Sequence, residues 1–171
     1  IQFIPGDLKC WRLPNREDLV MVMAWPPCTH LAVSGARWFK GKGLFALSQA
    51  IELVAHAATA CEASGRPYLI ENPISTLSTY WRSPDYLFDP CDYGGYLNDA
   101  GDAYTKRTCL WTGGGFVMPP FRGVEPVEGS KMHLLPPSEE RAALRSATPL
   151  GFAQAVYEYN QPGQPSHAHS G

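Results

Sequence analysis

The sequence predicts an α/β fold in which parallel strands alternate with helices. Two short apolar runs, 19–25 and 67–71, are typical of strands in a buried sheet. Between them, residues 44–63 repeat apolar side chains at three- and four-residue spacing, which indicates an amphipathic helix. A strand, a helix and a second strand in this order form a βαβ unit with a right-handed crossover. Because run 19–25 is apolar on both faces, we expect it to be a central strand.

The other elements follow from proline, glycine and capping signals. Residues 1–18 are expected to hold a strand end and a loop, and residues 26–43 a long loop of the kind that is often functional. Thr148 is expected to cap the final helix, with Pro149 at its first position. The remaining expectations are an irregular stretch at 72–103, a strand at 104–112, a proline-rich loop at 116–137, a short helix at 139–145 and an end of the final helix near Tyr159.

The composition indicates one globular domain over residues 1–160, followed by a flexible tail at 161–171. Hydrophobic residues make up 44% of the chain and charged residues 18%, a balance that supports a folded core rather than disorder. No uninterrupted apolar run approaches the ~20 residues that span a bilayer, and no basic, apolar leader opens the chain. We therefore expect neither a membrane segment nor a signal peptide.

The cysteines and the net charge indicate the cellular compartment and limit the ligands that the protein is expected to bind. The five cysteines are an odd number without C-x-x-C spacing, which argues for a reducing, intracellular setting. A zinc site would have to combine Cys28 and His30 with a distant cysteine, a spacing that fits no common zinc pattern, so no metal is expected. With a formal net charge of −2, any affinity for nucleic acid must come from local basic clusters.

A cysteine and a carboxylate follow the two predicted strands. Pro26-Pro27-Cys28 comes directly after the first strand, and Glu71-Asn72-Pro73 ends the second. The carboxyl ends of parallel strands meet at one edge of the sheet, where ligands bind in open α/β folds. A thiolate beside a carboxylic acid suits attack on an electron-poor ring whose nitrogen must be protonated. Taken singly, each residue has an ordinary alternative: a small buried side chain for Cys28 and a solvent-facing one for Glu71.

Polar and basic residues surround these motifs. The loop that follows the cysteine holds four polar or basic residues that would favour its thiolate form: Thr29, His30, Ser34 and Arg37. Arg37, Lys40 and Lys42 are interleaved with aromatic residues, a pattern suited to contact with a nucleic-acid backbone and to base stacking. Lys106 and Arg107 can hold a phosphate or a base carbonyl, or can form a solvated strand face.

In their order along the chain, these motifs resemble those of the DNA cytosine 5-methyltransferases, most nearly the short forms found in phages. The resemblance spans roughly residues 6–160 and rests on Gly6-Asp7-Leu8, Pro26-Pro27-Cys28 with Ser34-Gly35, Glu71-Asn72-Pro73 and Thr105-Lys106-Arg107. It implies a Rossmann-like methyltransferase sheet with helices on both faces, incomplete at the N-terminus. It also implies an enzyme that acts on DNA in the cytoplasm of a bacterium or a phage-infected host.

The resemblance implies a role for each matching residue. Cys28 would add to carbon 6 of cytosine, Glu71 would act on ring nitrogen 3, and Asn72 would help to hold that loop. Arg107 matches the first arginine of the family's Gln-x-Arg-x-Arg motif. S-adenosylmethionine would supply the methyl group, and a duplex substrate would require base flipping. Cofactor contacts are implied for Asp7, Pro26 and Thr148, and contacts with DNA for Thr29, Ser34, Arg37, Lys40 and Lys106.

Departures from the family pattern define the alternatives. The chain begins downstream of the glycine-containing loop that would hold the methionine part of the cofactor. Thr105 and Cys109 stand where the family has Gln and a second Arg, and only about 40 residues separate Arg107 from the final helix. The alternatives are single-stranded DNA or a free cytosine nucleotide as substrate, a non-catalytic nucleic-acid-binding remnant, and one half of a split enzyme completed by a second polypeptide.

Overall fold

A computed structural model describes residues 19–33, 39–99, 101–130 and 147–161 of the chain. These residues fall into two compact units. The described residues of the first unit come from Ile1–Tyr86 and Cys109–Phe116, and those of the second from Leu87–Thr108 and Val117–Gly171.

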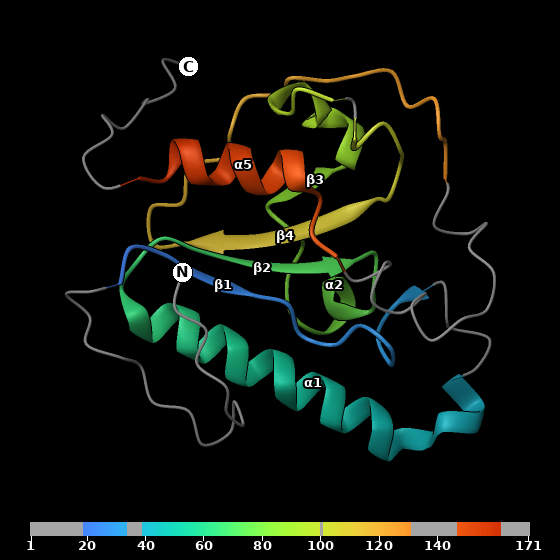
Figure 1. The fold of residues 1–171 in the computed structure, drawn as a ribbon. Coiled ribbons are helices and arrows are strands. Elements are labelled where there is room, and N and C mark those ends of the chain that lie inside the picture. The colour runs from blue at the N-terminus through green and yellow to red at the C-terminus, as the bar shows by residue number, and fades with distance from the viewer. Residues whose placement is uncertain (1–18, 34–38, 100, 131–146, 162–171) are drawn as a thin grey trace. The chain divides into compact units, whose positions relative to one another are not determined.

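A four-stranded sheet runs in the order β1-β2-β4-β3. The strands β1 (Val22–Ala24) and β2 (Tyr68–Pro73) are parallel, with a helix between them in the chain. β4 (Thr108–Gly113) points against β2 in Figure 1, and β3 (Tyr86–Phe88) forms the far edge, so the sheet is mixed. The parallel strands and their crossover helix confirm a coarse α/β fold.

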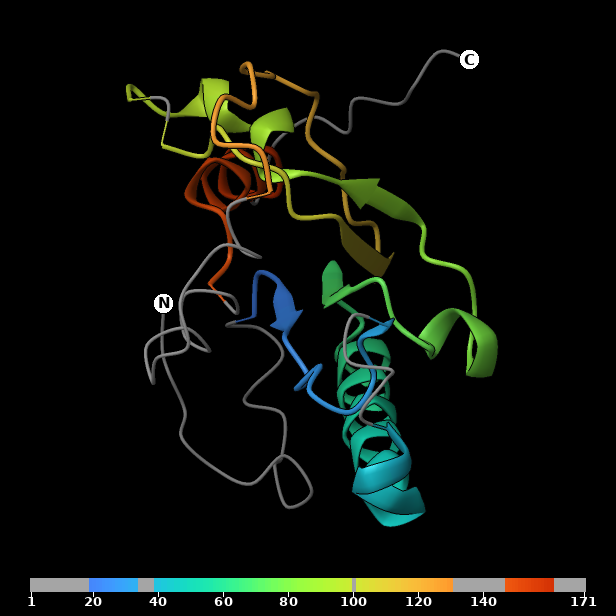
Figure 2. The ribbon, with the colours of Figure 1, turned by 90° about the vertical axis from the view of Figure 1, so that its right-hand side faces the viewer.

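The helix α1 (Phe39–Ser64) covers one face of β1 and β2 (Figures 1 and 2). The predicted helix at 44–63 is confirmed, but the helical structure begins at Phe39, inside the expected loop 26–43. Gly43 separates the first turn from the rest of α1, because its φ of 75° and ψ of 170° lie where glycine alone is comfortable. The core that α1 shares with the sheet includes Leu31, Ala50, Val54, Cys61, Tyr68 and Ile70.

β1 lies at an edge of the described sheet, so the expectation of a central strand is wrong for this part of the chain. Met23, at its middle, is 40% exposed, which means that only one face of the strand is covered. The strand is also shorter than the apolar run 19–25. Its ladder starts where the N–H of Val22 donates to the carbonyl of Pro67 at 2.9 Å, and it ends before Pro26-Pro27, which have no N–H to donate.

The stretch 72–103, expected to be irregular, holds several short elements. Their lengths of three or four residues explain why no periodic pattern marks them, since a helical or strand period needs more residues to show. They are α2 (Leu77–Tyr80), β3, and two 3₁₀ turns, η4 (Pro90–Asp92) and η5 (Gly94–Tyr96).

The second unit is built around packed aromatic rings, with α5 (Leu150–Tyr159) against η5. The ring centroids of Phe88 and Phe152 lie 4.2 Å apart, and those of Tyr93 and Phe152 lie 5.1 Å apart. All three side chains are buried. Aromatic burial of this kind gives a small unit much of its hydrophobic stabilisation.

The start of α5 differs from the prediction by one residue. Pro149, not Thr148, occupies the N-cap position, and no side-chain capping bond is made from it. Instead, Oδ2 of the buried Asp102 accepts the N–H of Gly151 at 2.7 Å. A carboxylate at this end of a helix satisfies a free N–H group and meets the positive end of the helix dipole.

β4 begins at Thr108 rather than at residue 104. The backbone N–H of Lys106 donates to Oδ1 of Asp89 at 2.8 Å, and the N–H of Thr105 donates to the carbonyl of Gly129. Because these donors are already used, residues 104–107 cannot extend the strand ladder. The glycine break after the strand and the open loop at 116–130 agree with the prediction.

Three expectations fall outside the described residues: the strand end within 1–18, the helix at 139–145 and the tail from 162 onward. By length and composition, one described helix, Lys40–Ser64 within α1, would be able to cross a membrane, although no uninterrupted apolar run of that length exists. This is weak evidence, because a core helix passes the same test, and Ala50 and Val54 of α1 are buried.

Candidate active site

The ends of β1 and β2 bring the two predicted motifs together. In the parallel register, Ala24 lies opposite Ile70, and Trp25 and Glu71 are the residues that come next along the chain. The indole Nε1 of Trp25 donates to Oε2 of Glu71 at 2.9 Å. One residue further along each chain, Nδ2 of Asn72 donates to the carbonyl of Pro26 at 3.0 Å. The two bonds join the strand ends at the edge of the sheet where α/β proteins bind ligands.

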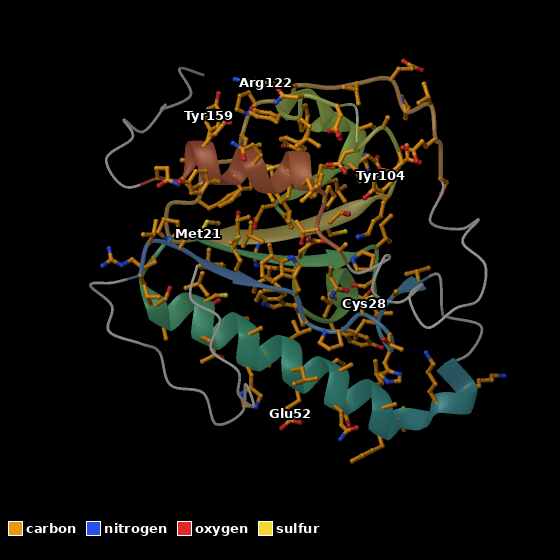
Figure 3. All side chains as sticks on the ribbon, viewed as in Figure 1. Met21, Cys28, Glu52, Tyr104, Arg122 and Tyr159 are labelled. Carbon is orange, nitrogen blue, oxygen red and sulfur yellow. The ribbon has the colours of Figure 1, made fainter. Side chains whose placement is uncertain are left out.

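The loop that carries Cys28 is fastened to the segment that follows β2. The carbonyl of Cys28 accepts the N–H groups of Leu31 and Ala32, both at 2.9 Å, which closes the loop into a turn. Ala32 then pairs with Ser75 in an antiparallel bridge. Figure 3 shows Cys28 in this loop, beyond the end of β1. The Cys28 loop is therefore hydrogen-bonded to the segment that follows Glu71 at the end of β2.

The chemical groups of the site differ in exposure. Cys28 is a half-buried free thiol, whereas Glu71 is 6% exposed and Asn72 is 2% exposed. Oδ1 of Asn72 is buried and finds no hydrogen-bond partner among the described residues, a costly state for an amide oxygen. A shielded carboxyl oriented by the indole N–H can hydrogen-bond a ring nitrogen, and a partly open thiol can reach a substrate.

A pocket of about 210 Å³ lies next to this loop. Nζ of Lys42 donates to the carbonyl of Thr29 at 2.7 Å, so the pocket wall is attached to the residue directly after Cys28. Nδ1 of His30 is buried and has no hydrogen-bond partner among the described residues. The lining residues are His30, Lys40, Lys42, Gly43, Leu44 and Leu47.

Trp25 is a site residue that the sequence pattern does not mark, since the pattern predicts it only as the last residue of a strand. The available signal was positional. Two parallel strands place their last residues side by side, so a donor at the end of one can meet an acceptor at the end of the other. The sequence carries no such signal for the pocket, whose lining includes Gly43 at the break in α1.

Lys106 and Arg107, expected on a strand, lie in the second unit and precede β4. Nη1 of Arg107 pairs with Oδ2 of Asp89 at 3.0 Å, and the Arg107 side chain is 51% exposed. Nζ of Lys106 donates to the carbonyl of Ala147 at 3.1 Å. Thr148 lies in the same unit, half-buried before α5. The expected roles of these three residues toward substrate or cofactor remain predictions.

Three more predicted site residues, Asp7, Ser34 and Arg37, lie outside the described residues. Of the residues expected to bind S-adenosylmethionine, only Pro26 lies in the described part of the first unit. It is buried, and its carbonyl already accepts from Asn72, so its ring would serve as an apolar wall rather than a polar anchor. The expected cofactor contacts of Asp7, Pro26 and Thr148 therefore remain predictions. Within the described residues, no group of three His, Cys, Asp or Glu side chains is placed to hold a metal ion.

Comparison with known proteins gives no relative: no protein-family model, curated protein or solved structure matches the chain.

Proposed function

We propose that this protein methylates carbon 5 of cytosine in DNA through a covalent adduct on Cys28. The observation that carries the proposal is the pair of hydrogen bonds at the ends of β1 and β2, from Trp25 to Glu71 and from Asn72 to Pro26. They hold a buried carboxyl group beside the loop of a half-buried thiol. The motif resemblance supports the same pairing of residues.

The side chains act on a ring that is a poor nucleophile at carbon 5. The Cys28 thiolate forms a bond to carbon 6, and the π electrons move toward carbon 5 as Glu71 gives a proton to nitrogen 3. S-adenosylmethionine, when bound, supplies the methyl group that carbon 5 takes up. Carbon 5 then loses its proton to water, the sulfur–carbon bond breaks, and nitrogen 3 returns its proton to Glu71.

Burial of Glu71 suits this role because a proton donor works best where water does not compete for the same hydrogen bond. The Trp25 N–H fixes one carboxyl oxygen, so the group is oriented before the substrate arrives. Asn72 holds the neighbouring backbone through the Pro26 carbonyl, which keeps the turn into Cys28 in place. In this proposal Trp25 and Asn72 are positioning residues, whereas Cys28 and Glu71 touch the ring.

The adduct can be trapped with DNA that contains 5-fluorocytosine, because fluorine cannot leave carbon 5 as a cation. With S-adenosylmethionine present, we expect the wild type to form a protein–DNA complex that survives denaturing electrophoresis. Cys28→Ser should form none, while Cys91→Ala, which changes a cysteine of the second unit, should still form it. An adduct of equal yield in Cys28→Ser would contradict the proposal.

A second measurement separates thiol addition from methyl transfer. Addition at carbon 6 makes the carbon 5 proton exchangeable, so the wild type in D₂O should catalyse deuterium incorporation into cytosine even without cofactor. Cys28→Ser and Glu71→Gln should each lower this exchange by at least tenfold, as is usual for loss of an acid or a nucleophile. Exchange at the wild-type rate in either variant would remove that residue from the mechanism.

A further inference from the structure

The pocket beside the Cys28 loop combines a mostly apolar lining with basic side chains. Two lysines and a histidine contribute to its lining, and no carboxylate is among the described residues that line it. Lys40 is exposed and Lys42 is half-buried, so neither ammonium group is enclosed in the core. A compact positive charge on a flexible stem is a common protein partner for phosphate groups.

The break at Gly43 adds a second source of positive potential. It ends the first turn of α1 and starts a fresh helical segment near Leu44, whose first N–H groups have no partner within the helix. Gly43 and Leu44 both line the pocket, so this helix start faces the same space as the lysines. Backbone N–H groups and the helix dipole at such a start favour an anion.

The pocket is also linked to the reactive loop. Nζ of Lys42 reaches the carbonyl of Thr29 at 2.7 Å, and the next residue, His30, has a buried Nδ1 without a described partner. An ammonium group has three protons, so Lys42 can hold the loop and still donate to a second acceptor. Leu44 and Leu47 provide an apolar wall, which suits the carbons of a sugar next to a phosphate.

We infer that this pocket binds the phosphate attached to the cytosine nucleotide whose ring reaches Cys28. The identity of that nucleotide rests on the proposed function, whereas phosphate binding at Lys40 and Lys42 does not. The same chemistry can come from the phosphomonoester of a free nucleotide or from a phosphodiester in DNA, and the ligands tested below distinguish the two.

The test is calorimetric titration of the wild type and of Lys40→Gln/Lys42→Gln. The ligands are 2′-deoxycytidine 5′-monophosphate, deoxycytidine, inorganic phosphate and an oligodeoxynucleotide with one cytosine. We expect the double variant to bind at least one phosphate-bearing ligand at least tenfold more weakly, because losing even one charged hydrogen bond costs about that much, and to bind deoxycytidine unchanged. Binding to the wild type should weaken between ~0.1 M and ~1 M salt, as the screening length falls from ~10 to ~3 Å.

One control variant and one single-lysine variant make the result interpretable. Arg66→Gln also removes one positive charge, but Arg66 follows the far end of α1, roughly 30 Å along the helix from Gly43, and should change nothing. Lys40→Gln alone alters an exposed side chain and should weaken binding without disturbing the Lys42 contact. If neither lysine variant weakens any phosphate-bearing ligand, the inference is overturned.

The ligand pattern identifies the source of the phosphate. Weakening of the monophosphate alone indicates a free nucleotide, and weakening of the oligonucleotide alone indicates DNA. A wild type that binds through the lysines but shows no deuterium exchange at carbon 5 would defeat the proposed function and leave the pocket standing. Normal deuterium exchange in the wild type, together with unchanged ligand binding in the lysine variants, would overturn the phosphate pocket and leave the proposed function standing.

Discussion

At the scale of single residues, the Trp25–Glu71 hydrogen bond defines the site most directly. The acceptor is buried, while Trp25 is 47% exposed, so the bond lies at the boundary between core and solvent. The bond orients the Glu71 carboxyl group, and this orientation matters more for the site than the free energy that the bond contributes. A carboxyl group that rotates freely would spend part of its time facing away from any ring bound near Cys28.

Trp25→Phe tests this role, because phenylalanine keeps an aromatic ring and removes the N–H donor. We expect the deuterium exchange at carbon 5 of cytosine to fall about fivefold, corresponding to ~1 kcal/mol for one hydrogen bond. The control is the double variant Trp25→Phe/Glu71→Gln. If both residues act through the same bond, the double variant should be no slower than Glu71→Gln. Independent, multiplying effects would show that Trp25 acts in another way.

At the scale of elements, the break in α1 does the most to shape the site. Gly43 divides a single long helix into a short first turn and a main segment, and Lys40, Lys42 and Leu44, on either side of this break, line one pocket. The exposed face of the main segment, marked by Glu52 in Figure 3, points away from the sheet. The apolar face supplies the core under β1 and β2.

Gly43→Ala should therefore be destabilising even though no atom lies within 4 Å of the added carbon. An alanine in this backbone conformation costs ~1–3 kcal/mol, which corresponds to a lowering of several degrees in the melting temperature of a chain this long. Thermal unfolding followed by circular dichroism measures it. Gly41→Ala is the matched control, since Gly41 has no positive φ and also has open space around it. Equal melting temperatures for the two variants would mean that the break carries no strain.

At the scale of the whole molecule, the two units have separate interiors. Cys61 and Cys109 are buried in the first unit and Cys91 in the second, while Cys28 is only half-buried. Burial, with a smaller contribution from Glu62, raises the pKa of the Cys61 thiol to about 12. Burial also raises the pKa of Cys91, assisted by the charges of Asp92 and Asp89. Thiols held protonated and inside the protein react slowly.

Alkylation by iodoacetamide, followed by peptide mass mapping, should therefore show which cysteines of the two units are shielded in the folded protein. Under native conditions we expect Cys28 to be modified first, and Cys61 and Cys91 only as the chain opens. In denaturant all of these cysteines should react at similar rates, which serves as the control. Native labelling of Cys61 as fast as Cys28 would contradict the packing of α1 on the sheet.

The sequence allowed the α/β class and the order of β1, α1 and β2 to be predicted, because apolar periodicity over many residues is a local signal. It also allowed the ends of β1 and β2 to be placed side by side, because parallel strands end on the same side, whereas the pairing of Cys28 with Glu71 stays a prediction. The edge position of β1 in the described sheet could not be predicted, since an apolar run indicates that a strand is shielded from water but not how many strands pair with it. The short elements after Asn72 leave too few residues for a pattern.

The sequence by itself determined which chemical groups this protein carries and which secondary structures hold them, since both are written in residue type and spacing. Tertiary structure alone decided the contacts that give those groups direction. Trp25 meets Glu71 across 46 residues, Lys42 meets Thr29 across 13, and Asp102 meets the start of α5 across 49. Such contacts depend on strand register and on the path of loops. Both are set by the packing of the whole unit and not by any local stretch of chain.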